Sequence, residues 1–68
     1  MIYPNLSAEM ARCRMTQAEL AEALGKTASV MSLKLSGKTP ISLDEAVEIK
    51  RAVGTRLTLD ALFDKDVM

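Results

Sequence analysis

Residues 15–38, MTQAELAEALGKTASVMSLKLSGK, have the pattern of two short helices joined by a tight turn. Thr16 and Glu19 match a capping box, in which the hydroxyl accepts from the Glu19 amide while the carboxylate accepts from the Thr16 amide. The segment AELAEAL that follows is rich in strong helix formers. Gly25 comes directly after it, at the position where a helix end favours a left-handed residue and therefore glycine.

The second helix of this pair begins near Thr27 and ends before Gly37, which is again a glycine at a helix end. Its apolar residues are Val30, Met31 and Leu35. Two helices joined by so short a turn must approach closely, and Ala21 offers a small side chain at the expected crossing point. Met31 is placed to fill the space beside Leu20 and Leu24. The spacing predicts a helix-turn-helix over residues 16–37.

This stretch resembles the lambda-repressor and Cro family, also called the XRE family of regulators. The residues that carry the resemblance are Gln17, Glu19, Leu20, Ala21, Gly25, Met31 and Gly37. With the flanking helices, the resemblance covers roughly residues 6–63. It implies a compact all-α domain of five helices, with the helix-turn-helix at helices 2 and 3. We expect the whole chain, residues 1–68, to form this single DNA-binding domain.

A first helix is expected to begin after Pro4, with Asn5 or Ser7 as its N-cap. Leu6, Met10 and Cys13 follow at helical spacing and predict a stripe that packs on the core. On this stripe, Cys13 is expected to be a small buried hydrophobe.

The fourth and fifth helices follow the helix-turn-helix. Ser42 and Glu45 form a second capping box, and Gly54 marks the end of the fourth helix. The expected buried face of that helix is Leu43, Ala46, Ile49 and Val53. Thr58 is expected to cap a short last helix, LDALF, and the residues expected to close the core or to join a dimer contact are Leu57, Leu62 and Phe63.

Length and composition restrict the class of protein. At 68 residues the chain has room for one small core, which dimerisation would help to stabilise. No apolar run reaches the roughly 18 residues that suggest a membrane span, and the start MIYPNL lacks the features of a signal peptide. One cysteine cannot form an internal disulfide. We therefore expect a cytoplasmic protein.

The charges balance over the chain but not along it. The formal net charge is zero, whereas strong nucleic-acid binders are often basic overall. Residues 1–40 carry five basic and three acidic side chains, and residues 41–68 carry four basic and six acidic ones. This distribution is compatible with one surface that faces DNA, without requiring one.

The resemblance implies which residues would contact DNA. The second helix of the motif enters the major groove, so the positions that face base edges are Thr27, Ala28, Ser29, Ser32 and Leu33. Hydroxyl groups pair with several bases, and the set lacks Gln, Asn and Arg, so we expect modest direct specificity. A glutamine at the position of Gln17 commonly contacts the DNA backbone in the family. The expected sources of positive charge around this surface are Lys26, Lys34 and Lys38.

Lys34 departs from the family pattern, because many relatives carry an apolar residue there. Two arrangements are open: the Lys34 stem extends outward to a phosphate, or the helix is rotated and Leu33 is partly buried. The rotation would remove Leu33 from the residues that read bases.

Catalysis has little support in this sequence. Histidine, the commonest general base and metal ligand, is absent, and one cysteine excludes a cysteine-rich zinc site. Each glycine is isolated, so there is no glycine-rich phosphate loop. We expect no enzyme activity, no cofactor, no metal and no small-molecule ligand.

The expected function is that of a phage-repressor-like or Cro-like transcriptional regulator. Such a protein binds operator DNA as a homodimer, and its half-sites lie about 34 Å apart, so the operator would be an imperfect palindrome. The alternative is an antitoxin or accessory protein that uses the same fold mainly to bind another protein. An apolar patch that joins Leu33 to Leu57, Leu62 and Phe63 would support this alternative.

Overall fold

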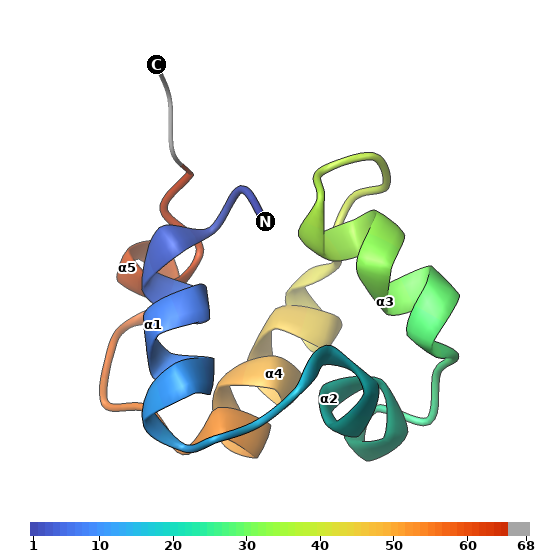
Figure 1. Ribbon diagram of the computed structural model, residues 1–68. Coiled ribbons are helices and arrows are strands. Elements are labelled where there is room, and N and C mark those ends of the chain that lie inside the picture. Colours follow the sequence, from blue (N-terminus) through green and yellow to red (C-terminus); the bar gives the residue numbers. More distant parts are fainter. Residues whose placement is uncertain (66–68) are drawn as a thin grey trace.

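The structure is a computed structural model, and it describes residues 1–65. It contains α1 (Pro4–Arg12), α2 (Gln17–Ala23), α3 (Ala28–Leu35), α4 (Leu43–Val53) and α5 (Leu59–Leu62), with no strand within this range. The all-α prediction and the number of helices are therefore confirmed. In Figure 1, α1 and α5 lie on one side of α4, and α2 and α3 lie on the other.

Four of the five helices begin at a hydroxyl side chain that accepts from the backbone amide three residues on. The four N-caps are Thr16, Thr27, Ser42 and Thr58. Both predicted capping boxes are complete: the amides of Thr16 and Ser42 donate to Glu19 and Glu45 at 2.9 and 3.0 Å. Because such caps satisfy amides that a helix start leaves free, the helix starts follow from the local sequence.

The turn between α2 and α3 is tight because Gly25 adopts a φ of +68°. One residue further on, the Lys26 amide donates to the Ala21 carbonyl over 2.8 Å, which reverses the chain direction. α3 then starts from its cap at Thr27. Two short helices with a left-handed glycine between them thus lie where the sequence predicts two helices and a tight turn.

The core lies where the inner faces of the helices meet. Its largest fully buried side chains are Leu6, Leu20, Met31, Leu35, Ile49 and Leu62. Ala21 is also buried, and α2 packs against both α3 and α4. The start of the chain is tied to this core, since the Ile2 amide donates to the Leu35 carbonyl over 3.1 Å.

Three sequence predictions about helix ends are wrong. Tyr3 rather than Asn5 or Ser7 is the N-cap of α1, and the Asn5 amide donates across the fold to the Ala61 carbonyl at 2.8 Å. Cys13 is exposed, because α1 ends at Arg12 and leaves the cysteine at the C-cap. Leu43 is 71% exposed, although the three other residues of its expected buried face are buried.

Candidate nucleic-acid interface

α3 has one buried face and one exposed face. Met31 and Leu35 lie one turn apart and are fully covered by the core. The positions expected to read bases are all exposed: Thr27, Ala28, Ser29, Ser32 and Leu33. Burial of Met31 and Leu35 fixes the rotation of α3 about its axis. With this rotation, Ser29 and Ser32 face the solvent.

The exposed face of α3 is also partly apolar. Val30 and Leu33 are 40% and 42% exposed. Of the apolar residues Val30, Met31 and Leu35, Met31 and Leu35 are therefore buried and Val30 is not. Apolar side chains on a reading helix can contact thymine methyl groups, and they can equally contact a protein.

Lys34 does not follow either arrangement expected for it. Its ammonium donates to Glu45 Oε1 and to the Pro40 carbonyl, both over 3.1 Å, and its side chain is only 15% exposed. The Lys34 side chain therefore does not extend outward to the solvent. The helix is not rotated in the way that would bury Leu33 either, because Leu33 stays exposed. The lysine instead binds the start of α4.

Lys26, from the turn between α2 and α3, reaches the same carboxylate. Its ammonium lies 3.2 Å from Glu45 Oε2. That oxygen is buried and accepts no well-aligned hydrogen bond, so charge attraction to Lys26 compensates its burial. We call Glu45, Lys26 and Lys34 the Glu45 cluster.

The surroundings of Glu45 favour its ionised form. The hydrogen bond from the Ser42 amide, together with the nearby ammonium groups of Lys34 and Lys26, lowers the pKa of Glu45 to about 2, although burial opposes this shift. Glu45 is therefore charged at neutral pH, and the Glu45 cluster carries a net charge of +1 rather than +2. The predicted interface is less basic than its three lysines suggest.

The remaining predicted contacts are exposed. Lys38 follows α3 and forms no ion pair within residues 1–65. Gln17 is the first residue of α2, beside the capping box at Thr16. Three lysines are predicted to contact phosphate. Two of them form ion pairs with Glu45, and Lys38 does not.

Sequence reasoning missed the role of Glu45 at this surface. The capping box identified Glu45 as a residue of α4, but its pairing with Lys34 joins residues eleven positions apart. Such a contact depends on how α3 packs against α4 and has no local sequence signal.

No group of three or more Cys, Asp or Glu side chains within residues 1–65 could hold a metal ion. No helix in this range is long and apolar enough to cross a membrane.

Comparisons with protein-family models, with curated proteins and with solved structures found no match for this chain.

Proposed function

We propose that this chain is a lambda-repressor-like or Cro-like transcriptional regulator that binds operator DNA in the cytoplasm, with α3 as its recognition helix. The observation that carries the proposal is the orientation of α3. Met31 and Leu35 hold one side in the core, while Ser29, Ser32 and Leu33 are left exposed. A helix presented in this way after a tight turn can enter a major groove with its first residues against base edges.

The charges around α3 suggest modest electrostatic attraction. Lys38 is free to approach a phosphate, and Gln17 can donate to one from the first turn of α2. The Glu45 cluster adds a net charge of only +1 beside them. We therefore expect moderate affinity at low salt, with sequence preference from the hydroxyls of α3 and from DNA shape.

The proposal predicts that Lys38→Ala lowers the salt dependence of duplex binding. Loss of one phosphate contact should reduce the slope of log K against log salt by about one unit. The matched control is Arg56→Ala, which removes one positive charge from the connection between α4 and α5, on the side of the molecule opposite α3 in Figure 1. Fluorescence anisotropy over a salt series measures both slopes.

Site selection from random duplexes tests base reading in the same set of proteins. Ser32→Ala should relax the selected sequence at one position in each half-site while the salt slope stays unchanged. Equal slopes for Lys38→Ala and Arg56→Ala, or no binding above a weak nonspecific level at low salt, would contradict the proposed function.

A third prediction concerns the Glu45 cluster. Glu45→Gln leaves Lys26 and Lys34 without their carboxylate partner, so DNA binding should tighten at low salt and its slope should rise by up to about one unit. Glu48→Gln, on the same helix and exposed, removes the same charge and is the control. The two variants would behave alike if the lysines of the cluster lie away from the DNA.

A protein partner is the second candidate function, and the exposure of Val30 and Leu33 favours it. The patch that would have supported it best does not form, because Leu62 is fully buried and Leu57 and Phe63 pack against the core. What remains is a smaller apolar strip on α3. The salt series separates the two functions, since a protein-binding α3 predicts no steep salt dependence on DNA.

A further inference from the structure

Leu33 lies on the side of α3 that points away from the core. Met31 and Leu35 are fully buried, whereas Leu33 between them is 42% exposed. Successive helix residues are turned by about 100°, so Leu33 lies about 180° from the midpoint of the two buried positions. This side of a recognition helix comes closest to the base edges when the helix enters a major groove. An aliphatic side chain thus occupies the central reading position.

The hydroxyl groups beside Leu33 are free. Ser29, one turn before it, and Ser32 make no side-chain hydrogen bond within the described part of the chain. By contrast, the hydroxyls of Thr27 and Ser36 bond to the backbone of α3 itself. A serine hydroxyl can donate or accept and therefore pairs with several bases, so Ser29 and Ser32 select among bases only weakly. Strong selection by direct contact therefore depends on the apolar side chain.

The surroundings of Leu33 suit a polyanion better than a protein. Residues 23–43, which include the turn, α3 and the segment after it, contain three lysines and no acidic residue. A stable protein interface buries about 800 Å² on each partner. Val30 and Leu33, of which neither is more than 42% exposed, supply only a small part of such an area. The charge and the narrow apolar strip therefore favour DNA as the molecule that covers Leu33.

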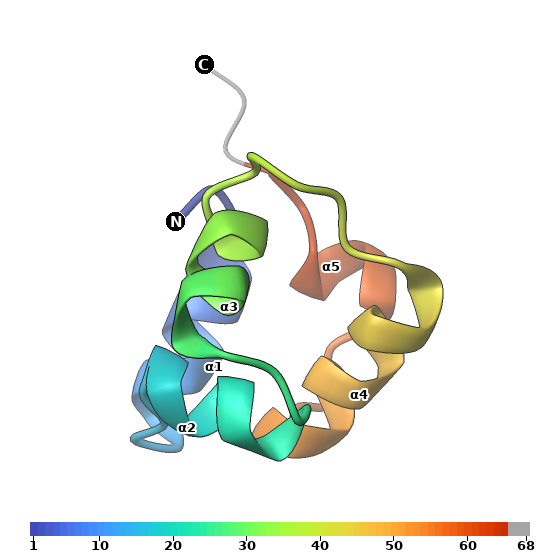
Figure 2. The same ribbon diagram turned by 90° about the vertical axis from the view of Figure 1, so that its right-hand side faces the viewer.

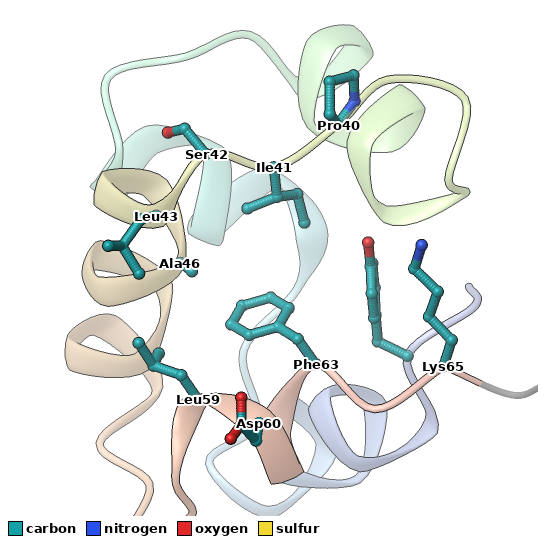
Figure 3. Close-up of a pocket in the computed structure, with 10 residues that line it drawn as sticks. Pro40, Ile41, Ser42, Leu43, Ala46, Leu59, Asp60, Phe63 and Lys65 are labelled. Carbon is teal, nitrogen blue, oxygen red and sulfur yellow. The ribbon is translucent and has the colours of Figure 1, made fainter.

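A hollow of about 500 Å³ elsewhere on the surface does not extend this strip. It lies between the segment that precedes α4, the first turn of α4, and α5, and no residue of α3 lines it. Figure 3 shows Leu43 and Leu59 along one side of the hollow and Lys65 on the opposite side. In Figure 2, α3 lies on one side of the molecule, and the start of α4 and α5 lie on the other. The hollow therefore offers no pocket for an anchor side chain of a protein bound at Leu33.

The major groove offers an aliphatic side chain one specific partner, which is the 5-methyl group of thymine. We propose that Leu33 selects thymine: its side chain contacts the 5-methyl group of one thymine in each half-site, and Ser29 bonds to a neighbouring base. The other bases lack this methyl group and present mainly polar edges, which Leu33 would cover without replacing their hydrogen bonds to water. This inference rests on the proposed function and names the base that α3 selects.

Uracil substitution tests the contact at the level of one methyl group. Uracil pairs with adenine as thymine does but lacks the 5-methyl group. The probe is the duplex obtained by site selection, in which each thymine is replaced by uracil in turn. Fluorescence anisotropy should show one thymine in each half-site whose replacement weakens binding about fourfold, the effect expected for one buried methyl group. The salt slope should be the same on both duplexes, because the substitution changes no charge.

Variants of Leu33 show whether this residue makes the contact. Leu33→Ala should bind the thymine duplex at least as weakly as the parent protein binds the uracil duplex, and uracil should cause it no further loss. Alanine is the strongest helix former, so this variant should stay folded by circular dichroism. Leu33→Met keeps an apolar side chain of similar reach and should keep the uracil effect. The matched control is Leu43→Ala, which removes the same atoms from a side chain that is 71% exposed on α4 and should also keep the effect.

The outcomes separate this inference from the proposed function. A selected site without thymine, equal affinity for the thymine and uracil duplexes at every position, or an unchanged uracil effect in Leu33→Ala would overturn the inference while DNA binding stands. Absence of duplex binding above a weak nonspecific level at low salt would refute the proposed function and the inference together. Leu33 would then belong to a surface that binds a protein.

Discussion

Replacing Glu45 by Gln is expected to lower the free energy of unfolding at pH 7 by about 1–2 kcal/mol, which is less than the full lowering of its pKa implies because Gln keeps an acceptor for the Ser42 amide. The Glu45 carboxylate joins three parts of the fold, since it accepts from the Ser42 amide and pairs with Lys26 and Lys34. Gln keeps an acceptor for the Ser42 amide but has no charge for the two ammonium groups. The loss therefore measures the charge attraction, which burial of the side chain makes stronger than at an exposed site.

The pH dependence of this loss identifies its cause. The pKa of Glu45 is about 2 in the folded chain against an ordinary value of 4.5, so its stabilising contribution is fully present above pH 4.5. It is lost as the pH falls from 4.5 towards 2, because the proton then binds more readily to the unfolded chain. The difference in stability between the parent protein and Glu45→Gln should shrink over this window.

Urea denaturation at a series of pH values measures the difference directly. Glu48→Gln is the control, because Glu48 lies on the same helix, is exposed, and makes no ion pair within residues 1–65. Its stability should follow that of the parent protein within about 0.5 kcal/mol. A Glu45→Gln effect of constant size from pH 7 to pH 2 would mean that packing, rather than charge, explains it.

The starts of α2, α3, α4 and α5 could be predicted from the sequence because each depends on four consecutive residues. Thr16 with Glu19, and Ser42 with Glu45, contain both halves of a capping box within a single turn. The turn between α2 and α3 depends in the same way on one residue, since the φ of +68° at Gly25 is a conformation that other residues adopt only with strain. Such interactions require no knowledge of the rest of the fold.

The end of α1 could not be predicted in the same way. Arg14 adopts a φ of +57° there, and the Met15 amide donates to the Met10 carbonyl over 2.8 Å. An arginine gives no sequence signal for a left-handed residue, so helical spacing predicts that the stripe of Leu6 and Met10 continues to Cys13. The chain turns before that position becomes part of the core.

The candidate site was only partly predictable, because some of its contacts join residues on different helices. Helical spacing correctly predicts Met31 in the core, whereas the resemblance, and not periodicity, implies that Ser29 and Ser32 face outward, where both are exposed. Periodicity has a limit here. It does not reveal that an acidic residue on another helix engages a lysine of α3. Nor does it reveal that Leu43, although in phase with Ala46, lies in a first turn that no element within residues 1–65 covers.

Replacing Met31 by Ala should lower the free energy of unfolding by about 2–5 kcal/mol, which is the range for large-to-small changes in a packed core. Met31 is 0% exposed and lies in one cluster with Leu20 and Ala21 of α2. A 68-residue domain has a total stability of only about 3–10 kcal/mol. We therefore expect Met31→Ala to unfold at a much lower urea concentration, or to be partly unfolded without urea.

Two matched variants show whether this loss arises from the buried contact. Met31→Leu keeps most of the volume and should cost less than about 1.5 kcal/mol. Val30→Ala changes the neighbouring residue, which is 40% exposed, and should cost less than about 1 kcal/mol. A Met31→Ala loss as small as that of Val30→Ala would mean that Met31 does not hold α3 against α2. The outward orientation of Ser29 and Ser32, on which the proposed reading of DNA depends, would then lack its main support.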